Sequence, residues 1–108
     1  MYDDLVATLK STDIPFAEYA WDSPPDTDYG VISVDSEGAS FGANMHKTHQ
    51  APQGTIDLFT RSNDRTAMQT IQEVLEAFNG CAWYLSSVQY EDATRLIHWE
   101  WVFTLEMW

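Results

Sequence analysis

Residues 95–108 carry the most regular pattern in the chain, because large apolar side chains recur there at every second position. One face of this segment holds Ile97, Trp99, Trp101, Phe103, Leu105 and Met107, and the other holds Leu96, His98, Glu100, Val102, Thr104 and Glu106. Such alternation, in β-branched and aromatic residues, is typical of a β-strand that buries one face. A strand of this kind is unstable alone, so we expect paired strands beside it and a second layer over its apolar face.

Other segments predict further strands of the same sheet. Alternation and β-branched residues indicate strands at 29–35, 54–61 and 82–90, with a shorter strand at 16–21 and a hairpin arm at 39–45 after a turn at 36–38. The alternation in the third of these is broken around Ser86 and Ser87. A loop of three or four residues from Glu91 onward is expected before the terminal strand, because no Asn-Gly or Asp-Gly pair marks a tight hairpin.

Two helices are predicted from apolar residues at spacings of three and four. The first spans residues 2–10, with acidic residues at its start and Lys10 at its end. The second follows N-cap candidates at 62–64 and ends near residue 78 or 79, before Gly80 in a left-handed cap. Its polar side comprises Gln69, Gln72, Glu73 and Glu76, and its apolar stripe comprises Ala67, Met68, Ile71, Val74, Leu75 and Phe78. We expect this stripe to cover the apolar face of the terminal strand.

The order α-β-β-β-β-α-β-β with short connections predicts an α+β fold: a single mostly antiparallel sheet with two helices packed on one face. A length of 108 residues corresponds to one domain, 1–108. The other face of such a sheet is left open, and we place Tyr84, Val102, Thr104 and Trp108 on it. Exposed aromatic residues of this kind either meet another protein or complete the monomer's own core.

Charge and composition narrow the classes of function. Asp and Glu number 17 against 5 Lys and Arg, which gives a formal net charge of −12. A chain this acidic should repel nucleic-acid phosphates and anionic membrane surfaces. The lone cysteine, Cys81, is interpreted as a small buried hydrophobe. With neither a signal peptide nor a membrane span in the sequence, we expect an intracellular, soluble protein.

Candidate sites for chemistry are few. His46 and His49 would bind zinc only with a third ligand from elsewhere, and a polar loop at a partner surface is the alternative. Asp22, Asp26 and Asp28 lie in a proline-containing loop that lacks the spacing of an EF-hand, so a solvated acidic loop is favoured over a calcium site. His98 and Glu100 are an acid–base candidate on the polar face of the terminal strand. No nucleophile elbow or phosphate-binding loop occurs, so we predict no enzyme, no metal and no cofactor.

The sequence resembles the small tail terminator, or tail-completion, proteins of long-tailed bacteriophages. The resemblance rests on the strand T-I-D-L-F-T-R, the turn S-N-D, the helix A-M-Q-T-I-Q-E-V-L-E-A-F and the closing W-V-F-T-L, preceded by a D-I-P turn and Y-G-V-I-S-V. It covers nearly the whole chain as a layout of elements and fits least well at residues 41–52.

The resemblance implies a structural virion protein that forms an oligomeric ring, a hexamer, on the tail tube. Its partners would be further copies of itself, the tail tube protein and a head-completion or neck protein, with DNA passing through the lumen unbound and no membrane involved. It would act in the virion tail, after assembly in the host cytoplasm. The alternatives are another neck, connector or minor tail component, or a small metal-dependent enzyme built on His46 and His49.

Contact and lumen residues are predicted from their positions in the chain. Candidate acids for a lumen are Asp22, Asp26 and Asp28, and candidate interface residues are Phe41, Met45, His46, His49, His98, Glu100 and Val102.

Overall fold

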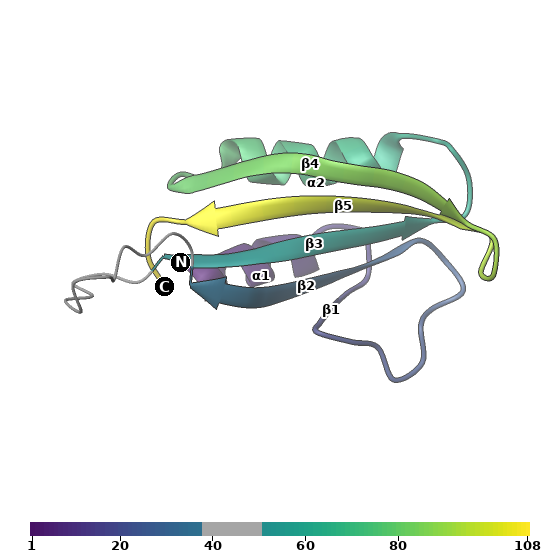
Figure 1. Ribbon diagram of the computed structural model, residues 1–108, viewed down its shortest axis with the longest axis horizontal. Coiled ribbons are helices and arrows are strands. Elements are labelled where there is room, and N and C mark those ends of the chain that lie inside the picture. Colours follow the sequence, from purple (N-terminus) through teal and green to yellow (C-terminus); the bar gives the residue numbers. More distant parts are fainter. Residues whose placement is uncertain (38–50) are drawn as a thin grey trace.

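A computed structural model describes residues 1–37 and 51–108. The elements in chain order are α1 (Tyr2–Lys10), β1 (Phe16–Glu18), β2 (Tyr29–Glu37), β3 (Pro52–Thr60), α2 (Thr66–Ala77), β4 (Cys81–Glu91) and β5 (Leu96–Leu105). The strands form one five-stranded sheet in the order β1-β2-β3-β5-β4 (Figure 1). All neighbours are antiparallel except β1 and β2, which pair in parallel.

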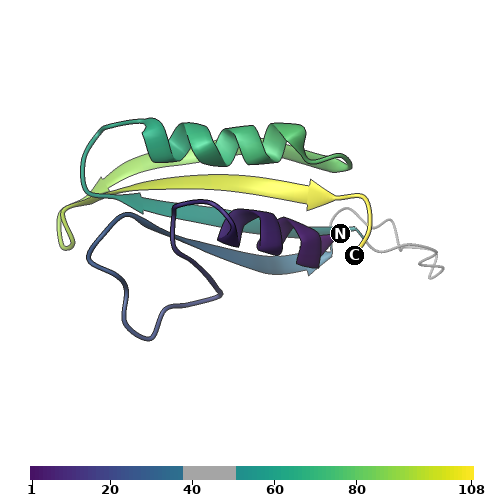
Figure 2. The same cartoon turned by 180° about the vertical axis from the view of Figure 1, so that it is seen from behind.

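Both helices lie on the same face of the sheet. They lie behind the strands in Figure 1 and in front of them in Figure 2, with α2 on the β4 side and α1 on the β2 side. The predicted α+β class, with a mostly antiparallel sheet and one helical layer, is therefore confirmed. None of the helices in the described ranges combines the length and the apolar character that a membrane crossing requires.

The core forms between the helices and one face of the sheet, because alternate residues of the central strands point to that side. Burial alternates along the whole of β3, and Trp101 of β5 is completely buried. The indole Nε1 of Trp101 donates a hydrogen bond to Oε1 of Gln72, at 3.2 Å. This bond holds α2 over β5, as predicted for the terminal strand, although Gln72 was assigned to the wet side of the helix and is instead partly buried.

The chain end departs from the predicted pattern. Strand β5 stops at Leu105, and the next backbone amide, that of Glu106, donates to the Gly80 carbonyl oxygen at 2.9 Å. The chain then meets the start of α1, where the Tyr2 amide donates to the Trp108 carbonyl oxygen at 2.9 Å and the two rings meet edge to face. The predictions of a buried Met107 and of Trp108 on the open face are therefore wrong, because their segment has left the sheet; Met107 is 58% exposed.

Two further boundaries, the end of β2 and the start of α2, differ from the sequence-based expectation. Strand β2 continues through residues 36–37, where a turn was expected, and the hairpin arm expected at 39–45 lies outside the described residues. Helix α2 begins at Thr66, whose backbone amide donates a hydrogen bond to the Asp64 carboxylate at 3.0 Å. Gly80 takes the predicted left-handed conformation, with φ of 81°.

The broken alternation at Ser86 and Ser87 has a structural cause. The pairing of β4 with β5 shifts register between Leu85 and Ser87, which marks a β-bulge that leaves Ser86 without a partner residue. The extra residue shifts the alternation of the strand by one position. Before the bulge the odd-numbered residues face the core, and after it the even-numbered residues do.

Candidate functional site on the open face of the sheet

The face of the sheet opposite the helices is covered by no helix or strand of the described residues (Figure 1). The strand registers arrange its side chains in rows that run across the strands. The first row comprises Tyr29, Phe59, His98 and Gln89, the second Val31, Asp57, Glu100 and Ser87, and the third Ser33, Thr55, Val102 and Tyr84. The predicted interface residues His98, Glu100 and Val102 therefore all lie on this open face, one in each row.

The first row is an aromatic stack. The ring centroids of Tyr29 and Phe59 lie 5.0 Å apart at an interplanar angle of 22°, and those of Phe59 and His98 lie 4.4 Å apart at 20°. Trp21, from the loop before β2, meets Tyr29 edge to face at 6.2 Å. Its indole also donates to the Gly30 carbonyl oxygen at 3.0 Å, which fixes its position. Stacked rings of this kind give the open face a flat, semi-rigid strip.

Two carboxylates flank the imidazole of His98. Its Nε2 lies 2.7 Å from Oδ1 of Asp57, and its Nδ1 lies 3.3 Å from Oε2 of Glu91. The contact with Asp57 is a hydrogen bond, and the contact with Glu91 is an ion pair when the imidazole is protonated. The suggested pairing of His98 with Glu100 is corrected here: alternate residues of one strand lie in successive rows, whereas Asp57 and Glu91 come from neighbouring strands.

The Asp57 carboxyl on this face is more than half-removed from water. Its burial raises its pKa above the usual value, and the nearby Glu100 carboxylate acts in the same direction, while the hydrogen bond and charge of His98 oppose both. Asp57 and Glu100 are direct cross-strand neighbours. Two acids so placed repel each other, and His98 offsets that repulsion.

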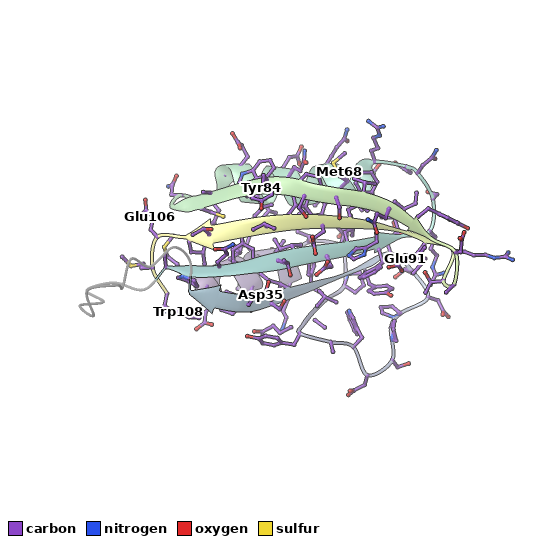
Figure 3. The ribbon with its side chains drawn as sticks, viewed as in Figure 1. Asp35, Met68, Tyr84, Glu91, Glu106 and Trp108 are labelled. Carbon is purple, nitrogen blue, oxygen red and sulfur yellow. The ribbon has the colours of Figure 1, made fainter. Side chains whose placement is uncertain are left out.

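The third row carries hydroxyl groups at its β2 and β3 positions and exposed apolar surface towards its β4 end. The hydroxyl groups of Ser33 and Thr55 lie 3.3 Å apart, and Thr55 donates to Asp57 Oδ2 at 3.3 Å. Val102 lies between Thr55 and Tyr84, and Tyr84 is 60% exposed. Figure 3 views this face, with Tyr84 on β4 and Glu91 at the β4–β5 hairpin. Together the rows form a broad surface with hydroxyl, carboxyl and aromatic groups, which suits contact with another protein.

The acidic loop at residues 22–28 lies beside the sheet. Asp22 and Asp26 are exposed. Asp28 instead accepts a hydrogen bond from the Arg61 amide at 2.9 Å, and the Arg61 guanidinium donates to the Pro25 carbonyl oxygen at 3.3 Å. Asp28 thus fastens the loop to the end of β3, and a lumen role for the three acids stays a prediction.

The remaining predicted contact residues, Phe41, Met45, His46 and His49, lie outside the described residues. Within residues 1–37 and 51–108, no group of three or more His, Cys, Asp or Glu side chains is placed to hold a metal ion. Cys81 is half-buried against the core, and burial raises the pKa of its thiol to about 11. This agrees with the interpretation of Cys81 as a packing residue and makes it a poor nucleophile at neutral pH.

Sequence reasoning missed Tyr29, Phe59, Asp57 and Glu91 as members of this face. Tyr29, Asp57 and Phe59 occupy strand positions that alternate with buried residues, so their outward direction was readable, whereas Glu91 was expected at the start of the loop. Their meeting at His98 depends on strand order and register, which a single sequence does not specify. Comparison with known proteins adds no relative: no family model matches the chain, and no curated protein matches it.

Proposed function

We propose that this protein is a structural assembly subunit that binds other protein subunits through the open face of its sheet. The observation that carries the proposal is the uncovered face itself, with its stacked row of Tyr29, Phe59 and His98 and its exposed Tyr84. Aromatic residues are enriched at the centres of protein interfaces, and side chains already held by their neighbours lose little entropy on binding.

The particular form that the sequence resemblance suggests is a tail terminator of a long-tailed phage. In that role copies of the chain form a ring, which caps the tail tube and joins it to a head-completion protein. The charge of −12 supports this role, because a ring through which DNA passes benefits from walls that do not bind phosphate. The activity proposed is assembly, without a catalytic step or a bound cofactor.

The test is the mass of the purified full-length chain by native mass spectrometry, alone and with polymerising tail-tube subunits of the phage that encodes it. We expect ring-sized oligomers and tubes whose growth stops on addition of the protein. The variant V102R, in the centre of the open face, should abolish both. The control variant A77R places the same side chain on an exposed position of α2, on the helical side of the molecule, and should leave both unchanged.

A chain that stays monomeric at high concentration and leaves tube growth unaffected would overturn the proposal. Equal effects of V102R and A77R would also overturn the assignment of the contact to the open face. Far-UV circular dichroism of both variants verifies that the fold is retained.

A further inference from the structure

Strand β4 forms a long edge of the sheet. It has 11 residues and hydrogen-bonds to β5 on one side, and the described part of the chain supplies no strand on its other side (Figure 1). The outward backbone N–H and C=O groups of such an edge are a template for another strand. The opposite edge is different, because β1 has only 3 residues.

The side chains of β4 do not protect this edge. Of the exposed large hydrophobic residues in the described ranges, four lie on β4: Tyr84, Leu85, Val88 and Tyr90. The strand contains no lysine and no proline, which are the usual devices against edge pairing, and its one charged residue is Glu91 at its end. In a chain with a net charge of −12, this strand itself carries a single carboxylate, and the Glu100 carboxylate of β5 is held beside it by the Ser86 hydroxyl at 2.6 Å.

We propose that β4 pairs antiparallel with β4 of a second copy, around a twofold axis that passes between Ser86 and Ser87. The pairing joins the two sheets into one continuous sheet. A second copy is the partner because the strand is complementary to itself. In an isologous contact the same patch of both copies must match, and the side chains of β4 match in one register.

The β-bulge decides that register. Before the bulge Trp83 and Leu85 lie on the helix side of the sheet, opposite Phe103 and Trp101; after it Val88 lies on that side, opposite Trp99. If Ser86 faces Ser87 of the other copy, the bulges coincide and every side chain meets one from its own face. The resulting pairs, each formed twice, are Leu85 with Val88, Trp83 with Tyr90, Tyr84 with Gln89, and Ala82 with Glu91.

This register suits the chemistry of the paired side chains. Leu85 and Val88, which are 38% and 47% exposed, cover each other on both sides of the axis. Glu91 faces Ala82, so the two Glu91 carboxylates of the paired strands do not oppose each other across the contact. A shift by one residue would set apolar residues of the helix side against polar residues of the open face.

The contact is separate from the proposed ring. A ring that presents different faces to the tail tube and the head needs heterologous contacts between its subunits, whereas β4 pairing is isologous. Evidence against one of the two contacts is therefore not evidence against the other. If both hold, β4 pairing joins free subunits, or two rings back to back.

The experiment measures the mass of the full-length chain by sedimentation velocity at physiological salt, with V88E, L85K and the double variant L85K/V88E. Where the chain forms no ring, we expect the wild type at twice the 12.3 kDa of the chain and each single variant at the monomer mass. The double variant should recover the dimer, because opposite charges then face each other twice in the proposed register. The control M107E changes an exposed apolar residue outside β4 and should leave the dimer intact.

Three results would overturn the pairing: a wild type that is monomeric at every concentration, single variants that keep the wild-type mass, or a double variant that stays monomeric. Should the wild type form rings, β4 pairing predicts paired rings that V88E reduces to single rings of half the mass. Rings whose mass V88E does not change would overturn β4 pairing but support the ring proposal. Wild-type dimers that V88E dissociates, and that never cap tubes, would support β4 pairing and overturn the ring proposal.

Discussion

Strands β5 and β4 lie side by side and are similarly rich in aromatic and aliphatic residues, yet they differ sharply in burial. Trp101 of β5 is completely buried, whereas its cross-strand partner on β4, Leu85, is 38% exposed. The difference follows from position: β5 has a strand on each side and α2 against it, while β4 has one neighbour and only part of its helix-side face covered.

The comparison shows that composition alone does not tell a core strand from a binding edge. A central strand uses its aromatic residues to stabilise the fold, and each is held from several sides. The same residue types on an edge contribute less to the fold and remain available for a partner. The strictness of alternation distinguishes the two strands better, because β5 buries every second residue from Trp99 to Leu105, whereas β4 is interrupted by a bulge.

The largest difference between the two strands is expected from truncation of the cross-strand partners Trp101 and Leu85. W101A should lower the free energy of unfolding by about 3–5 kcal/mol, because it leaves a large cavity and an unpaired Gln72 side chain under α2. L85A should lower it by less than about 1.5 kcal/mol, because much of its side chain is already in water. Urea denaturation of both, in the V88E background to keep the chains monomeric, measures the difference.

Similar losses for W101A and L85A would show that β4 is as much a part of the core as β5. The proposal that β4 is a free contact strand would then lose its main physical basis.

Much of the fold was predictable because buried positions recur at regular intervals in the sequence, every second residue in a strand and every three or four residues in a helix. The alternation of residues 97–105 and the stripe of α2 specified one helical layer on one face, and the structure confirms it. The errors cluster where periodicity ends. Met107 continues the alternation in sequence but not in space, because backbone bonds at Glu106 and Trp108 draw the chain towards Gly80 and α1.

The candidate site was predictable only in part. The outward direction of His98, Glu100 and Val102 followed from alternation alone. The acids that bind His98 did not, because Asp57 lies 41 residues away in sequence and meets it only through the β3–β5 register. The hydrophobic pattern specifies which face of each strand is buried, but no tight turn joins β3 to β5, so the sequence does not specify which of their residues pair.

A smaller effect is expected from two hydroxyl groups, one central and one at the edge. Thr60 is completely buried, where it accepts a hydrogen bond from Trp99 Nε1 at 3.1 Å and donates to the Ser62 carbonyl oxygen at 3.0 Å. T60V should destabilise the fold by about 1–3 kcal/mol, because it leaves the buried indole N–H unpaired. S86A removes a hydroxyl that bonds Glu100 at 2.6 Å in an exposed position and should cost about 0.5 kcal/mol or less.

A double-mutant cycle with W99F identifies the source of the effect. Removal of the indole donor should make T60V less damaging, since no N–H is then left without a partner. Equal effects of T60V with and without W99F, measured by thermal and urea denaturation, would show that the Trp99–Thr60 bond is not the cause.

The smallest effect is a pH dependence that separates a half-buried carboxyl from an exposed one. Burial raises the pKa of Asp57 in the folded state above its unfolded value, so the folded state holds the extra proton and this residue's contribution to stability falls as pH rises through that interval. Hydrogen bonds from Thr66 lower the pKa of the exposed Asp64, so its contribution is present above the unfolded pKa and is lost as pH falls. From pH 3 to pH 6 the stability of the wild type relative to D57N should therefore decrease, and relative to D64N it should increase. Urea denaturation across this range measures both slopes, and slopes of the same sign would contradict the distinction between the two sites.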